Sequence, residues 1–211
     1  MTRPDDRGLI LMPDISGYTA FVHAAHPEHA QAVVSTLLEA LLQAEQLGLE
    51  LRDIEGDALF FYRAGAVPGF ERIMDQVTRW YEAFHEARRH YRPSEGCRCG
   101  ACGQLESLSL KVVAHYGRVR VQKIGPLHKL FGADVILAHR LLKNSLPLHS
   151  YFLFTGALAE RCGRGVTTRF GCVRHEEDYP VFGPTMLNVI RLPNTAGGAV
   201  DPDVVRAAGH G

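Results

Sequence analysis

Two aspartates, Asp14 and Asp57, stand at the edges of strand-like apolar runs, where an acidic side chain must be kept out of a hydrophobic core. Asp14 follows the apolar residues 9–13, and Asp57 precedes the apolar residues 58–62. Two carboxylates that lie far apart in sequence suit a site for hard divalent metal ions, whose coordination shell is completed by waters and substrate phosphates. The pair therefore predicts a metal site.

Each aspartate also has a purely structural interpretation. Asp14 could cap a helix that opens at Ser16, and Asp57 could belong to a Gly-Asp hairpin turn. For either residue alone the structural role is favoured, whereas the two together favour a site.

The elements that must position these carboxylates are predicted from apolar periodicity and from turn residues. In chain order we expect a strand over 9–15, a short helix to about 22, a helix over 27–46, strands over 49–54 and 58–62, a helix over 70–91, strands over 105–115 and 118–124 joined by a turn at Gly117, a helix over 132–143, a strand over 151–154, and terminal strands within 181–192. Asp57 should lie at the tip of the hairpin formed by the second and third strands. The order predicts an α+β fold, a ferredoxin-like sheet with helices packed on one face.

Length and composition indicate one domain. A chain of 211 residues with 46% hydrophobic content can bury one substantial core. We expect a leader over 1–8, the domain over 9–192 with an inserted Cys-rich loop at 93–104, and a flexible tail over 193–211.

Charge and hydropathy argue against some partners. The 23 basic and 23 acidic side chains cancel without a run of like charge, so neither nucleic acid nor an anionic membrane is an expected partner. No segment approaches the roughly 20 apolar residues of a membrane span, and the N-terminus lacks an apolar signal region. We expect a soluble, cytoplasmic protein.

Three of the five cysteines, Cys97, Cys99 and Cys102, fall within six residues of a Gly-containing loop. This density suits a Zn²⁺ ion held by thiolates, which need tight turns to converge. The fourth ligand stays open, and the candidates are Cys162, Cys172, His90, His115 and a water. The alternative is a loop of free thiols, reactive or inert.

Taken in order, the motifs resemble the catalytic domain of class III adenylate and guanylate cyclases over about residues 9–192. Pro-Asp-Ile-Ser-Gly-Tyr-Thr at 13–19 is similar to the first metal motif, and Gly-Asp at 56–57 to the second. His-Tyr-Gly-Arg-Val at 115–119 and Phe-Gly-Ala-Asp-Val-Ile-Leu-Ala-His-Arg at 131–140 resemble the strand and helix that follow. Within that class the chain more closely resembles an uncharacterised bacterial family of unknown function.

The resemblance implies a mechanism and an assembly. Asp14 and Asp57 would bind two Mg²⁺ or Mn²⁺ ions that activate a ribose 3′-hydroxyl and neutralise a nucleoside triphosphate. The backbone of Ile15, Ser16 and Gly17 would cradle phosphate oxygens. In the family the arginine at the position of Arg140 comes from the partner chain, which implies a homodimer with sites at the interface.

The chain departs from the cyclase pattern at several positions. Ile136 stands where cyclases place a ribose-orienting asparagine, and an isoleucine side chain cannot form a hydrogen bond. Asp53 and Lys129 stand at the base-selecting positions, with acid and base exchanged relative to adenylate cyclases. A phosphate-binding lysine near the C-terminus has no counterpart, since Lys143 is the last lysine.

Two functions therefore stay open. One is a nucleotidyl cyclase, and the other is a degenerate cyclase-like module that binds nucleotide, metal or a partner without turnover.

Overall fold

A seven-stranded sheet forms the centre of the protein in the computed structural model, which describes residues 7–91 and 105–193. Its strands are β1 (Arg7–Ser16), β2 (Glu50–Glu55), β3 (Ala58–Ala64), β4 (Ser109–Arg118), β7 (Tyr151–Thr155), β8 (Val173–Tyr179) and β9 (Gly183–Arg191). They lie in the order β2-β3-β1-β4-β7-β9-β8, and every pair is antiparallel except β4 with β7. The α+β class predicted from the sequence is confirmed.

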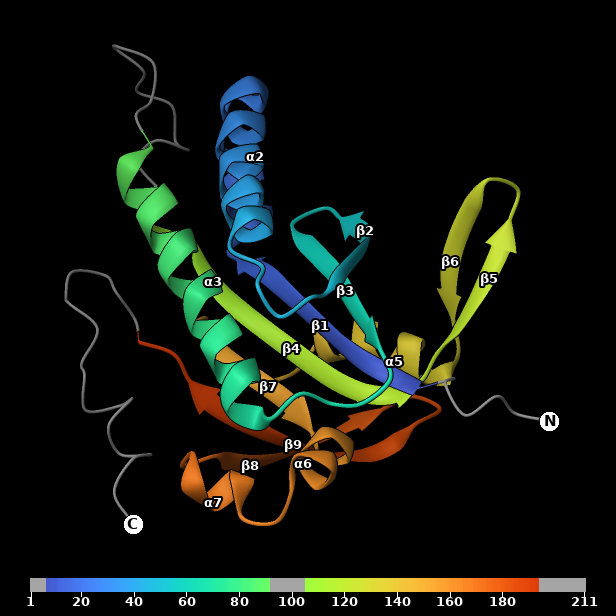
Figure 1. The fold of residues 1–211 in the computed structure, drawn as a ribbon. Helices are drawn as coiled ribbons and strands as arrows, with labels where there is room; N and C mark the ends of the chain where they lie inside the picture. Colours follow the sequence, from blue (N-terminus) through green and yellow to red (C-terminus); the bar gives the residue numbers. More distant parts are fainter. Residues whose placement is uncertain (1–6, 92–104, 194–211) are drawn as a thin grey trace.

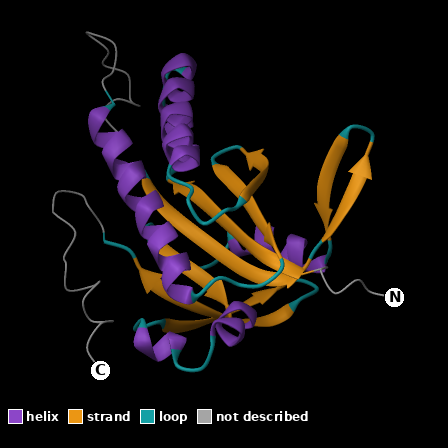
Figure 2. Ribbon diagram, in the orientation of Figure 1, coloured by secondary structure: helices purple, strands orange, loops and turns teal. Residues whose placement is uncertain are grey.

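The remaining elements are mostly helical. They are α1 (Tyr18–Ala24), α2 (Pro27–Gln43), α3 (Phe70–His90), the 3-10 turn η1 (Leu105–Ser107), α5 (Ala133–Leu141), α6 (Gly156–Cys162) and α7 (Val166–Arg169), together with a separate hairpin of β5 (Arg120–Ile124) and β6 (Leu127–Phe131). The long helices α2 and α3 lie side by side over the sheet, and the β5–β6 hairpin projects away from it (Figure 1; Figure 2).

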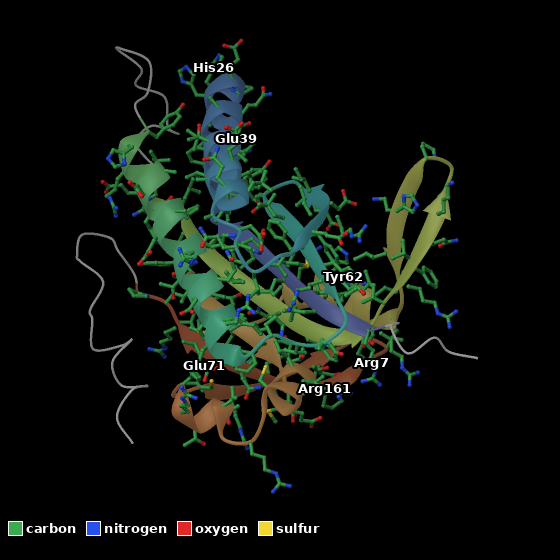
Figure 3. All side chains as sticks on the ribbon, viewed as in Figure 1. Arg7, His26, Glu39, Tyr62, Glu71 and Arg161 are labelled. Carbon is green, nitrogen blue, oxygen red and sulfur yellow. The ribbon has the colours of Figure 1, made fainter. Side chains whose placement is uncertain are left out.

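The sheet is buried on both faces because its central strands are apolar at successive positions. In β1, Leu9 and Leu11 join the core under α2 and α3, whereas Ile10 and Met12 join the core under α5. Polar residues of α2 such as Glu39 remain on its outer side (Figure 3). Helices thus cover both faces, and the expectation of helices on one face was wrong because the apolar side of α5 packs on the opposite face from α2 and α3.

Several predicted boundaries need correction. The first strand begins at Arg7, two residues earlier than expected, and pairs there with Arg118. The helix predicted to reach residue 46 ends at Gln43. At the other end, the Tyr81 hydroxyl donates to the carbonyl oxygen of Pro193 at 2.6 Å, so the first residue of the predicted tail is bound to the domain.

Gly117 is not a turn residue. It lies inside β4, and a Cβ placed on it would come within 2.3 Å of Cγ of Asp134. The glycine is required there by this close approach of α5, not by backbone curvature. The turn of the next hairpin lies at Gly125, whose φ of 59° is left-handed.

Candidate functional site

Asp14 reaches the site from the end of β1. Residues alternate between the two faces of a strand, so Asp14 follows Ile10 and Met12 onto the face that carries α5. Gly17, with φ of 88°, then turns the chain into α1. This local geometry places a carboxylate at the end of a fully buried strand.

Asp57 lies at the tip of the β2–β3 hairpin, as the sequence predicted. Gly56 adopts a φ of 64°, and Ala58, which follows Asp57, pairs with Asp14 across β1 and β3. The register brings the two aspartates together. Burial and the negative charge of Asp14 together raise the pKa of Asp57 to about 7.

An open cleft of about 930 Å³ contains both carboxylates. Its walls come from the β1–α1 junction, the β2–β3 turn, β4 and the C-terminal part of α5. The lining residues are Asp14, Ile15, Ser16, Gly17, Tyr18, Thr19, Ala20, Glu55, Asp57, Ala58, Lys111, Ile136, His139, Arg140, Leu142 and Lys143. Asp14 and Asp57 therefore share one cavity with a third carboxylate, Glu55, and with several basic side chains.

Lys111 is a site residue that the sequence analysis missed. It lies in β4 directly opposite Asp14, and its Nζ is 2.7 Å from Oδ2 of that carboxylate. It also donates to the carbonyl oxygen of Leu142 at 3.2 Å. A lone lysine within the apolar run 110–114 is the signal that could have revealed it, since a buried ammonium requires a partner.

The basic side chains on α5 and just after it differ in their partners. His139 Nδ1 lies 3.0 Å from Oε2 of Glu55, and its ring stacks on Phe60 with centroids 4.9 Å apart. Arg140 and Lys143 are exposed, and no side-chain partner is recorded for either among residues 7–91 and 105–193. Arg140 lines the cleft of its own chain, so these two cations are available to an anion there.

The predicted phosphate cradle is only partly free. Ile15, Ser16 and Gly17 all line the cleft, but the Ile15 amide donates to the Asp57 carbonyl oxygen at 3.4 Å. That amide is engaged in holding the hairpin against β1. Ser16 is itself paired with Ser109 at the end of β1, so Gly17 is the residue of the three that lies beyond the strand.

Asp53 and Lys129 meet beside the cleft. The Lys129 ammonium donates a hydrogen bond to Asp53 Oδ2, and this contact joins β6 to β2. The two residues line a smaller cavity of about 130 Å³. The hydrogen bond from Lys129 lowers the pKa of Asp53. The two positions singled out in the sequence are thus brought together within one chain.

The residues present fit a single divalent ion better than two. Carboxylate oxygens are suitable ligands for Mg²⁺ or Mn²⁺, but one oxygen of Asp14 is already bound by an ammonium. Within 7–91 and 105–193, no cluster of three or more His, Cys, Asp or Glu side chains is arranged for a metal. Asp14 and Asp57 would therefore need water or phosphate oxygens to complete a shell.

The cysteine loop lies outside the described residues, including Cys97, Cys99 and Cys102. Of the candidate fourth ligands, Cys162 and Cys172 are free thiols, and burial raises the pKa of each to about 11.

His115 is engaged at both ring nitrogens. Nδ1 lies 2.9 Å from Thr155 Oγ1, and Nε2 lies 3.2 Å from Asp134 Oδ1. These contacts tie β4 to β7 and to the first turn of α5, so His115 is not available as the fourth zinc ligand.

Comparison with known proteins identifies the family of the chain. Residues 34–151, more than half of its length, match the family described as Protein of unknown function (DUF2652). The chain belongs to this family. It is 33% identical over 159 residues to the uncharacterized protein Rv2561/Rv2562 of Mycobacterium tuberculosis, a match that covers 75% of this chain and 73% of that protein.

Solved structures confirm the fold. The adenylyl cyclase CyaB from P. aeruginosa superposes with a TM-score of 0.66 at 14% identity, covering 93% of this chain and all of that one. The guanylyl cyclase Cya2 gives the same TM-score at 15% identity, with coverages of 95% and 100%. This DUF2652 chain therefore has the class III cyclase fold, as the motifs predicted. None of its described helices is long and apolar enough to cross a membrane.

Proposed function

We propose that this DUF2652 protein binds a nucleoside triphosphate and a divalent ion in the cleft between Asp57 and Arg140. The observation that carries the proposal is the set of charges that line one cavity, with Asp14 and Asp57 on one side of the charge balance and the exposed cations of Arg140, on α5, and Lys143, just after α5, on the other. Carboxylates suit the ion, and cations suit phosphate oxygens. The cyclase fold of the neighbours CyaB and Cya2 supports the same ligand class.

The internal ion pairs favour an anionic ligand. Lys111 offsets Asp14, and His139 lies against Glu55, so these four groups are already partnered. Arg140 remains to bind phosphate. A guanidinium matches two phosphate oxygens at once, which favours a polyphosphate over a single carboxylate.

Formation of a cyclic nucleotide is the reaction that this arrangement would serve. The ribose 3′-oxygen would attack the α-phosphorus, its proton would leave to solvent, and the bond from that phosphorus to the pyrophosphate oxygen would break. A bound Mg²⁺ or Mn²⁺ ion would supply charge neutralisation and acidify the hydroxyl. Asp14 and Asp57 would hold the ion, and Arg140 would stabilise charge that develops on the phosphate.

One observation favours the second candidate, a module without turnover. Ile136 lines the cleft and is 54% exposed, so an apolar side chain faces the space where a ribose-orienting group is needed. Loss of one oriented polar group costs on the order of a hundredfold in rate. Nucleotide binding without rapid cyclisation is the expected behaviour of such a cleft.

Binding and turnover are tested separately. Nucleotide binding is measured by calorimetry for the native protein, for Arg140→Ala, and for Arg79→Ala as a matched control on the exposed side of α3. We expect Arg140→Ala to weaken triphosphate binding about tenfold or more and Arg79→Ala to leave it unchanged. Equal affinities for the two variants would contradict the proposed binding mode.

For turnover, cyclic products are sought by mass spectrometry after incubation with ATP, GTP, CTP or UTP and Mn²⁺, beside Asp57→Asn. A product that disappears in Asp57→Asn establishes a cyclase. Binding without product establishes the second candidate.

We also propose a homodimer that covers the β5–β6 hairpin. Three apolar side chains on this hairpin, Val121, Ile124 and Phe131, are 51%, 55% and 62% exposed. An isolated two-stranded hairpin is marginally stable in water, so a surface that covers it is expected. Replacement of Phe131 by Ser should shift the protein toward monomer in sedimentation, whereas Gln122→Ser on the same hairpin should not.

The zinc site stays a proposal on Cys97, Cys99 and Cys102. Three closely spaced thiolates suit Zn²⁺, and a fourth ligand from outside the loop would complete a tetrahedron. Metal analysis of the purified protein should find about one Zn²⁺ per chain, which Cys99→Ser loses. Retention of zinc by Cys99→Ser would contradict the assignment.

A further inference from the structure

Lys111 carries a positive charge into the cleft from near the start of β4. Its side chain is only 18% exposed, and the Asp14 side chain that it contacts is 10% exposed. The ammonium lies between two acceptors on different elements, Asp14 Oδ2 at 2.7 Å and the Leu142 carbonyl oxygen at 3.2 Å. Since both acceptors are fixed by the fold, the position of the charge is fixed as well.

The sheet register makes this arrangement specific. Asp14 pairs with Lys111 across β1 and β4, and Lys111 pairs with Tyr151 across β4 and β7. Directly paired residues on adjacent strands point to the same face, so these three side chains form one row beneath α5. The row places Lys111 beside the first carboxylate of the site.

The contact between Lys111 and the C-terminal end of α5 is also electrostatically favourable. Leu142 caps the C-terminus of α5, where carbonyl oxygens lack partners within the helix and the helix dipole is negative. Lys111 satisfies one of these carbonyls. It thereby ties Asp14 to the helix that carries Arg140.

A second cation at the same carboxylate would have to compete with this ammonium. A divalent ion on Asp14 Oδ2 would repel Lys111 across a short distance in a partly buried cleft. Moving Lys111 away would leave the Leu142 carbonyl without its donor and the ammonium without either of its partners. The two-ion arrangement implied by the cyclase resemblance therefore does not fit these side chains.

We propose that Lys111 is a built-in cation that fills one of the two cation positions of the cleft, so that the native protein binds one divalent ion fewer than a chain without this ammonium. The inference rests on the divalent-ion site proposed at Asp14 and Asp57. It specifies that the site of the native protein accepts one divalent ion, and it assigns the Lys111 ammonium to the second cation position.

The test is a Mn²⁺ titration followed by electron paramagnetic resonance, without nucleotide. Four proteins are compared, namely the native chain, Lys111→Met, Lys111→Arg and Asp57→Asn. Ions bound by Asp57→Asn are subtracted, because they belong to other surface ligands. We expect one Mn²⁺ per native chain, two per Lys111→Met chain, and one per Lys111→Arg chain.

Other outcomes separate this inference from the proposed function. Two ions on the native chain, or no gain in Lys111→Met, would overturn the role of Lys111. No ion on the native chain with one on Lys111→Met would support Lys111 as the resident cation while overturning the native divalent site. Loss of nucleotide binding alone affects only the proposed function.

Folding of the variant is followed by circular dichroism and thermal unfolding. Lys111→Met leaves Asp14 without its cation, so Mn²⁺ should raise the melting temperature of this variant more than that of the native chain. If the variant is unfolded without metal, recovery of the native spectrum on addition of Mn²⁺ supports the inference, and no recovery overturns it.

Discussion

Lys129 and Asp53 form an ion pair within one chain that joins the β5–β6 hairpin to the edge strand β2. In the adenylate cyclases that the chain resembles, acid and base occupy the opposite positions. If this pair reads the nucleotide base, its order should determine which base is preferred. The pair is exposed, so its contribution to folding is small.

The first prediction is a change in base preference on charge exchange. The double variant Asp53→Lys, Lys129→Asp keeps the ion pair but reverses its order, so ATP affinity relative to GTP should rise about tenfold. Calorimetry with both nucleotides measures the ratio. Lys129→Ala alone should unfold at nearly the native temperature, which controls for stability. An unchanged ratio of ATP to GTP affinity in the double variant would show that Asp53 and Lys129 do not select the base and serve only to hold the hairpin against β2.

The second prediction concerns pH and Asp57. Burial and the charge of Asp14 raise the pKa of Asp57 to about 7, so the folded protein binds more protons than the unfolded chain between about pH 4 and pH 7. The free energy of unfolding should therefore fall as pH rises through this window and stay low above it. Asp57→Asn lacks this titration. The free energy of unfolding of this variant, relative to that of the native chain, should therefore increase by on the order of 2 kcal/mol as pH rises through this window.

Urea unfolding at pH 4.5 and at pH 8 would measure this difference. Carboxylates outside the Asp14–Asp57 pair titrate equally in both proteins, so the difference between the two stability curves reports on this pair. Parallel curves for the native chain and Asp57→Asn would contradict the raised pKa.

The third prediction tests the close approach of Gly117 and Asp134. A Cβ at Gly117 would push Asp134 away from His115 and from the Arg118 amide, to which Asp134 Oδ2 is hydrogen-bonded at 2.5 Å. We expect Gly117→Ala to lower the free energy of unfolding by about 1–3 kcal/mol. Gly156→Ala is the matched control, since its nearest contact would be an ordinary 3.6 Å. Equal stability of the two variants would rule out this packing constraint.

Sequence patterns predicted most of the fold because local periodicity was strong. The hairpin that presents Asp57 and the strand that ends near Asp14 followed from turn residues and apolar runs. The role of Gly117 did not, because a glycine needed for tertiary contact has the same local signature as a turn glycine. The position of α5 on the second face was missed for a similar reason, since periodicity defines an apolar side but not the layer it joins.

Local pattern indicated the two carboxylates, and the cyclase resemblance added residues 15–17, Ile136 and Arg140, which also line the cleft. Asp14 and Asp57 stand at the edges of apolar strand segments, where a charged side chain is unexpected and can be recognised from the sequence alone. Lys111 was missed because its partner, Asp14, lies 97 positions away and becomes adjacent only through the β1–β4 register. The pairing of Asp53 with Lys129 likewise depends on how the β5–β6 hairpin lies against β2. Long-range pairing, rather than local composition, completes the site.

The last prediction concerns the apolar side chain of Ile136 in the cleft. Ile136 lies on α5, is 54% exposed, and shares the cleft wall with Arg140 one helical turn later. Ile136→Asn would place an amide where an oriented hydrogen-bonding group is missing, and its effect on stability should stay within about 0.5 kcal/mol because the position is exposed. If the chain cyclises nucleotides, we expect product formation to rise by ten- to a hundredfold, on the order expected of one oriented polar group. Ile136→Leu is the matched control, since it keeps size without polarity. Both variants could instead bind nucleotide as the native chain does and form no product. This result would show that Ile136 is not what prevents turnover, and it would favour the binding module.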